Sequence, residues 1–242
     1  MIARGIGGPF SGPQGPYLLV LLLLVLAFFT GNLAAPLRNA SSDPVGFLGF
    51  VIAVVLGITV HEFMHAYVAH RLGDDTGRLL GRMSLNPLAH LDVFGSFLLV
   101  LVGFGYGKPV PVNESRLRGG RASWSLVAAA GPLTNVALAA LCAIPIRFGG
   151  LDIGGEYFEI LELVVLYNCL LAVFNLIPIP PLDGSKVVYG LLPPSTAYAW
   201  RAYEQYGPLL LMFLFFFGGR FFFTFVNVPA LAIARVLLGV GR

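Results

Sequence analysis

The chain contains few charged residues. Only 11% of its 242 residues are Asp, Glu, Lys or Arg, whereas soluble domains carry about 25%. By contrast, 57% are hydrophobic and 20 are phenylalanine. The longest weakly apolar stretches, residues 73–92 and 107–122, have only the size of loops. This composition excludes an ordinary soluble enzyme and predicts an all-α polytopic membrane protein without an appended soluble module.

Cysteines and clustered basic residues are also scarce. Cys142 and Cys169 are the only two cysteines and lie within predicted spans, so we interpret them as small apolar core residues and not as a disulfide or thiolate metal site. No run of basic residues is interleaved with aromatic residues, which argues against nucleic acid as a partner. The lipid bilayer is the partner that the composition predicts.

Five apolar segments are predicted to cross the membrane, which takes about 20 residues per helix. The first could also be a signal peptide, but a retained anchor is favoured because several spans follow. Residues 1–16 are rich in Gly and Pro and are predicted to form a flexible tail, so that residues 17–242 form one membrane-embedded domain. A helix reaching about Gly239 either lies in the interface or makes a sixth span. The five spans are Tyr17–Ala35, Phe47–Leu72, Ser123–Ile146, Tyr157–Ile177 and Pro208–Phe225.

The segment Val93–Tyr106 is apolar but short, with glycines breaking its ends, so its length leaves open whether it spans the membrane or re-enters. Seven basic residues flank it, whereas each loop on the opposite face carries one. The positive-inside rule therefore places both flanks in the cytoplasm, and the segment is predicted to be re-entrant or β-like. The flanking residues are Arg71, Arg78 and Arg82 before it and Lys108, Arg116, Arg118 and Arg121 after it.

The second span contains the motif His61-Glu62-Phe63-Met64-His65. On a helix, two histidines four residues apart face the same side and can bind one Zn²⁺, with the glutamate placed to accept a proton from water. The alternative is a chance match in which both histidines are satisfied core residues. His61 precedes Arg71 by ten residues, which places it ~15 Å below the cytoplasmic surface.

A catalytic zinc site needs a third protein ligand. Glu156, Glu159 and Glu162 lie at the outer end of the fourth predicted span, which is the wrong end. Asp183 follows its inner end, after a segment with three prolines that break the helix. Gly184 is expected to let the chain turn sharply there. Taken alone, this segment also fits an ordinary helix-terminating turn.

The combination of these motifs resembles the site-2 protease family of intramembrane zinc metalloproteases, in its short form without a PDZ domain. The resemblance covers roughly residues 47–190. It rests on the histidine motif and on four further segments in order: Leu85-Asn86-Pro87-Leu88-Ala89-His90-Leu91-Asp92, Gly107-Lys108-Pro109-Val110-Pro111-Val112-Asn113, Gly131-Pro132-Leu133-Thr134-Asn135, and Asn175-Leu176-Ile177-Pro178-Ile179-Pro180-Pro181-Leu182-Asp183-Gly184.

The resemblance implies a role for each matching residue. His61, His65 and Asp183 would bind one Zn²⁺ per subunit, and Glu62 would be the general base. Asn135 and Asn175 would donate hydrogen bonds to the developing oxyanion or to the substrate backbone. The alternative is that each asparagine only forms a hydrogen bond between helices. Apart from the resemblance, the X-Pro pairs of residues 107–113 predict an extended chain, so Lys108, Val110 and Val112 are expected to bind substrate as an added strand, with Val110 and Val112 donating because the prolines cannot.

The predicted function is an intramembrane zinc endopeptidase that cleaves a transmembrane protein substrate within or near its membrane segment. The protein would be a multi-pass component of the cell membrane with its active site nearer the cytoplasmic side. The alternative is a non-proteolytic zinc-binding membrane protein or transporter. A transporter favours internal repeats of discontinuous helices, and the sequence contains no convincing repeat.

Overall fold

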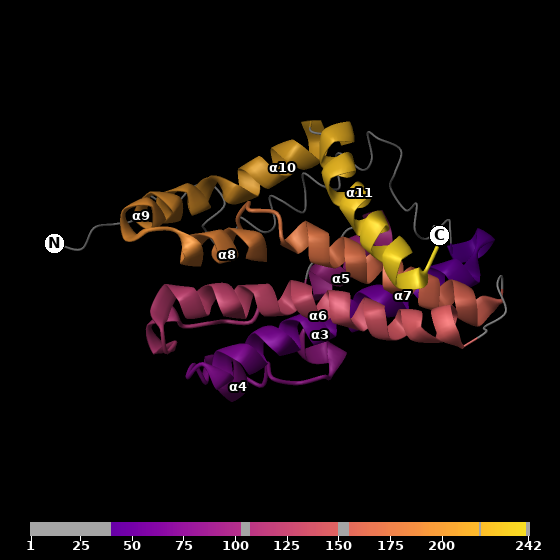
Figure 1. The fold of residues 1–242 in the computed structure, drawn as a ribbon, viewed down its shortest axis with the longest axis horizontal. Helices are drawn as coiled ribbons and strands as arrows, with labels where there is room; N and C mark the ends of the chain where they lie inside the picture. The colour runs from indigo at the N-terminus through magenta and orange to yellow at the C-terminus, as the bar shows by residue number, and fades with distance from the viewer. Residues whose placement is uncertain (1–39, 103–106, 150–154, 218, 241–242) are drawn as a thin grey trace.

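The computed structural model describes residues 40–102, 107–149, 155–217 and 219–240 (Figure 1). Within these ranges the chain is helical and forms no strand, apart from an isolated antiparallel bridge between Leu91 and Gly107. The all-α prediction is confirmed for this part of the chain. The predicted tail over residues 1–16 and the predicted first span, Tyr17–Ala35, lie outside the described residues.

Three of the described helices are long and apolar enough to cross a membrane. They are α3 (Pro44–Arg71), α6 (Gly120–Phe148) and α7 (Glu156–Asn175), and they correspond to the predicted second, third and fourth spans. Each helix packs against the other two, so that they lie alongside one another in Figure 1. Functional side chains on any of these helices can therefore meet between them.

Clear signals at both ends fix the extent of α3. The Asp43 side chain accepts a hydrogen bond from the Gly46 N–H at 2.8 Å, and Pro44 occupies the first turn, where a missing N–H costs nothing. At the other end, Gly73 has a φ of +109°, which a residue with a side chain rarely adopts. The histidine motif thus lies well inside a continuous helix of 28 residues.

Backbone contacts hold the two basic flanks of the short helix α5 (Val93–Val102) together. The Arg118 N–H donates to the Leu72 carbonyl at 2.8 Å, and the Lys108 N–H donates to the His90 carbonyl at 2.7 Å. Both flanks consequently lie at the end of the bundle where α3 ends and α6 begins. The short elements in these flanks are α4 (Thr76–Leu79), η1 (Pro87–Ala89) and η2 (Glu114–Arg116).

The chain leaves its helix after α7, as the prolines predict, and resumes in α8 (Asp183–Leu191), which packs on α6. Gly184 lies within α8 without a positive φ. A Cβ there would collide with the Leu176 carbonyl oxygen. Glycine is thus required for close approach to the chain before α8, and not for the sharp turn expected from the sequence. Helix α9 (Pro194–Tyr203) and η3 (Glu204–Tyr206) follow.

The last predicted span is divided in the structure. Helix α10 (Gly207–Phe217) and helix α11 (Gly219–Leu238) are separate, so no single helix covers residues 208–225. Helix α11 crosses α7 and also contacts α6 (Figure 1). Small side chains form the core there, which lets the three helices approach closely. This core contains Ala139, Ala143, Val165, Cys169, Ala230 and Ala234.

Candidate metal centre

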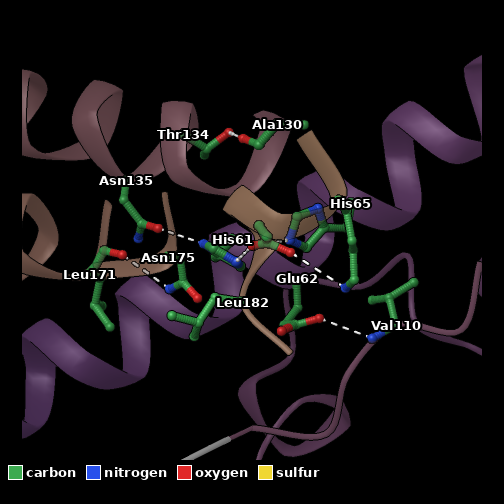
Figure 2. Close-up of polar contacts among 12 residues, drawn as sticks. His61, Glu62, His65, Val110, Ala130, Thr134, Asn135, Leu171, Asn175 and Leu182 are labelled. Carbon is green, nitrogen blue, oxygen red and sulfur yellow. Dashed lines mark hydrogen bonds and ion pairs between the residues drawn. The ribbon is translucent and has the colours of Figure 1, made fainter. Parts of the chain in front are cut away.

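Three potential metal ligands converge between α3 and the start of α8. The Asp183 Oδ2 atom lies 2.9 Å from the His61 Nε2 atom and 3.1 Å from the His65 Nε2 atom. All three residues are buried, and their ligand atoms lie within 4.8 Å of one another. Figure 2 shows both imidazoles projecting from α3 toward the same point. The helix break after α7 is what allows the aspartate to reach this point.

The outer nitrogens of both histidines face oxygen atoms. The His61 Nδ1 atom lies 2.6 Å from the Asn135 Oδ1 atom, and the His65 Nδ1 atom lies 2.7 Å from the Val127 carbonyl oxygen. Because these oxygens only accept, each Nδ1 carries the proton and each Nε2 keeps a lone pair. Two lone pairs and a carboxylate oxygen then face one another, an arrangement that a bound cation stabilises. The donor set fits zinc, which binds histidine nitrogen and carboxylate oxygen.

Gly131 of α6 keeps the space beside the two histidines open. A Cβ at this position would lie 2.5 Å from the His65 Nε2 atom and 2.6 Å from the His61 Nε2 atom. Real Cβ atoms do not approach other heavy atoms so closely, so any side chain here would displace the imidazoles. The glycine of the Gly-Pro-x-x-Asn segment therefore leaves room where an ion would bind.

Glu62 lies beside the two candidate ligand histidines and is half-buried. Its Oε2 atom accepts a hydrogen bond from the backbone N–H of Val110 at 3.0 Å (Figure 2). The side chain of Val112 packs against a small apolar cluster of Ala69, Leu117 and Val127. The extended segment predicted to bind substrate thus runs along the last turns of α3, next to the candidate base.

Asp74 anchors the far end of this segment. Its Oδ2 atom accepts from the Asn113 N–H at 2.6 Å, and its Oδ1 atom accepts from the N–H and the hydroxyl of Thr76. Burial raises the pKa of this carboxyl, but the hydrogen bonds from Thr76 and Asn113 outweigh burial and hold the pKa below its ordinary value. The ionised carboxylate therefore fixes the segment to the end of α3.

The two asparagines proposed from the resemblance differ in their surroundings. Both amide hydrogens of Asn135 are donated within the protein, to the Gly57 carbonyl at 3.1 Å and to the Asn168 Oδ1 atom at 2.8 Å. Asn135 is fully buried and has no hydrogen left for a substrate. Asn175 is half-buried, and its Nδ2 atom donates to the Leu171 carbonyl at 3.0 Å (Figure 2).

Sequence reasoning missed two polar residues of this region. Asn168 is fully buried and bonded to Asn135; its position in an apolar span, two helical turns before Asn175, was a usable signal because polar residues at membrane depth are costly. Lys186 lies one turn after Asp183, with its Nζ atom 3.6 Å from the Asp183 Oδ1 atom. A lysine near a helix start carries no comparable signal in the sequence.

Comparisons with known proteins agree with this chemistry. The family model described as peptidase family M50 matches residues 151–217. "Putative zinc metalloprotease YwhC" of Bacillus subtilis is 38% identical over 178 residues, which cover 68% of this chain and 78% of the relative. "Putative zinc metalloprotease Rip2" of Mycolicibacterium smegmatis is 27% identical over 204 residues, covering 81% and 78%. "Zinc metalloprotease MJ0392" of Methanocaldococcus jannaschii is 25% identical over 169 residues, covering 69% and 42%. No solved structure matches the chain significantly.

Proposed function

Because this chain belongs to peptidase family M50, the site-2 protease family of zinc metalloproteases, we propose that it hydrolyses peptide bonds within or near the membrane segments of other membrane proteins. The observation that carries this proposal is the position of the ligand group. His61 and His65 lie in an apolar helix long enough to span the bilayer, and Asp183 reaches them from the break after a second such helix. A peptide bond must enter the membrane region to reach this site.

We assign His61, His65 and Asp183 as the ligands of one zinc ion and Glu62 as the general base. When bound, zinc supplies a Lewis acid that polarises the scissile carbonyl and acidifies a water molecule. Glu62 accepts the proton of that water and returns it to the leaving amine. The Val110 N–H holds the Oε2 atom of Glu62 in place, and the Oε1 atom would take the proton.

The extended segment 107–113 supports substrate binding in a more restricted form than the sequence suggested. The N–H groups of Lys108 and Val110 are already donated to the His90 carbonyl and to Glu62, and Pro109 and Pro111 have none. Of the two donors predicted from the sequence, Val110 is therefore taken, and a substrate strand added here would depend on the Val112 N–H and on its own amides, donated to carbonyls of the segment. Such pairing would hold the substrate extended beside Glu62.

We further propose a multi-pass protein in the cell membrane, with five or six spans and the active site nearer the cytoplasm. The described part of helix α5 has ten residues, which extend ~15 Å, about half of a hydrocarbon core of about 30 Å. Its flanks are joined by the Arg118–Leu72 and Lys108–His90 hydrogen bonds. Both observations support a segment that enters and leaves the membrane on one side.

The test is zinc-dependent cleavage by the purified full chain in lipid vesicles. A single-span test substrate is incubated with three preparations: the enzyme as purified, the enzyme after a chelator has removed zinc, and the same enzyme after zinc is restored. Mass spectrometry identifies the fragments. We expect cleavage to be lost and then regained. Zinc binding without fragments, together with zinc movement across the vesicle membrane, would instead indicate a transporter.

A further inference from the structure

A chain of buried amides connects α7 to the first candidate ligand. The Asn168 Oδ1 atom accepts from the Asn135 Nδ2 atom at 2.8 Å. The Asn135 Oδ1 atom in turn accepts from the His61 Nδ1 atom at 2.6 Å, a contact that Figure 2 shows. Both asparagines are fully buried. The side chains come from α7, α6 and α3, so this chain runs across all three long helices.

Backbone carbonyls fix which way each amide points. Asn168 donates through its Nδ2 atom to the Val164 carbonyl at 2.9 Å and to the Ala53 carbonyl at 3.4 Å. A carbonyl oxygen can only accept, so the NH₂ group of Asn168 must face it and the side-chain oxygen must face Asn135. The Gly57 carbonyl acts on Asn135 in the same way, from 3.1 Å.

The orientation of Asn135 decides which nitrogen of His61 can bind a metal. With the Asn135 oxygen toward the ring, His61 carries its proton on Nδ1 and presents the Nε2 lone pair to Asp183. If the Asn135 amide rotated by half a turn, its NH₂ group would face Nδ1 and favour the tautomer protonated on Nε2. A ring nitrogen that carries a proton cannot be a ligand.

We propose that Asn168 is a positioning residue for zinc binding, because its side-chain oxygen fixes the Asn135 amide and thereby the tautomer of His61. The inference rests on the proposed metal site and extends it by one residue. The hydrogen bonds of Asn168 go to Asn135 and to the Ala53 and Val164 carbonyls, so its link to His61 runs through Asn135. Gly57 leaves room for the link: a Cβ there would lie 2.8 Å from the Asn168 Oδ1 atom.

The experiment measures the zinc affinity of the full chain in detergent by competition with a chromophoric chelator. Asn168→Leu removes the accepting oxygen at nearly constant volume, whereas Asn168→Asp keeps an accepting oxygen toward Asn135. Val165→Ala is the matched control, since Val165 is fully buried in the same helix but lies in the apolar core with α11. Thermal unfolding of the zinc-free proteins reports stability separately.

We expect Asn168→Leu to bind zinc more weakly than wild type, by up to the roughly ten- to hundredfold that loss of a direct outer partner of a metal ligand causes. The zinc affinity of Asn168→Asp should be closer to that of wild type, even though a buried carboxyl lowers the unfolding temperature of this variant. A purely structural residue would instead make zinc affinity follow stability across the set. If Asn168→Leu does not fold, Asn168→Ala takes its place with the same expectation.

Wild-type zinc affinity in the folded Leu or Ala variant would overturn this inference and leave the metal site intact. The same holds if Asn168→Asp binds as weakly as Asn168→Leu. If the wild-type chain does not bind zinc, the proposed metal site itself is wrong. The measurement on wild type alone reveals that outcome.

Discussion

The backbone N–H of Val110 lies 3.0 Å from the Oε2 atom of Glu62, across 48 residues of sequence. A backbone donor cannot change its charge or swing away as a side chain can, so it holds the carboxylate in one orientation. The donor belongs to the same segment that we propose to bind substrate. In this proposal, substrate binding and the orientation of the base both depend on one short stretch of chain.

Val110→Pro tests this contact, because proline lacks the N–H and its neighbours on both sides are already prolines. A hydrogen bond to a charged group contributes about 1.5–3 kcal/mol. If that contribution is lost from the transition state, cleavage should be roughly ten- to hundredfold slower. Val110→Ala keeps the N–H and controls for the side chain. Equal activity of the two variants would remove the contact from the mechanism, provided that zinc content is unchanged in both.

Asp183→Asn should lower zinc occupancy strongly. Two neutral imidazoles form a poor zinc site without a carboxylate as the third ligand. The amide of asparagine keeps the size of the side chain but not its charge. Asp43→Asn is the matched control, because asparagine caps a helix about as well as aspartate and Asp43 lies at the far end of α3. Elemental analysis of the purified proteins measures the metal. Full zinc content in the Asp183 variant would point to another third ligand.

Gly131→Ala should weaken zinc binding while the protein still folds. The added Cβ would lie 2.6 Å or less from both Nε2 atoms, so the imidazoles must shift away from Asp183. Leu133→Ala, a change at an exposed position two residues further along α6, is the control. Chelator competition gives the affinities, and unfolding temperatures show whether the fold is retained. Unchanged affinity in the Gly131 variant would mean that the space beside the histidines is not needed by the ion.

The membrane topology can be tested with single cysteines in a background lacking Cys142 and Cys169. We expect Arg78→Cys and Arg118→Cys to react with a membrane-impermeant thiol reagent from the cytoplasmic side only. Arg147→Cys, at the opposite end of α6, should react only from the other side. All three positions are exposed, so access does not limit the reaction. Labelling of Arg78→Cys and Arg118→Cys from opposite faces would show that the segment between them crosses the membrane.

Local patterns predicted those parts of the site that depend on helical spacing or on chain breaks. His61 and His65 share a face because they are one turn apart, and the prolines before Asp183 identified the break that carries it to them. The three long helices could also be predicted from the sequence, since length and hydropathy determine whether a helix can span the bilayer.

Contacts between distant segments were not predictable in this way. Nothing in the sequence near Asn135 reveals that its amide hydrogens are taken by Gly57 and Asn168, because that depends on how α3, α6 and α7 pack. The same applies to the Val110 N–H, which the sequence suggested for a substrate and the fold directs to Glu62. The break between α10 and α11 is a different case, because Gly218, Gly219 and Arg220 interrupt the apolar run there and the span prediction passed over that signal.

The most direct measurement compares cleavage and zinc content of wild type and Glu62→Gln in the same lipid vesicles. Glutamine keeps the shape of the side chain but cannot accept the proton of water, and it leaves His61, His65 and Asp183 untouched. Glu162→Gln, on the exposed face of α7, controls for the loss of a carboxylate. We expect Glu62→Gln to retain about one zinc per chain and to produce no fragments, while the control cleaves normally. Cleavage by Glu62→Gln at a rate near that of wild type would contradict the proposed mechanism.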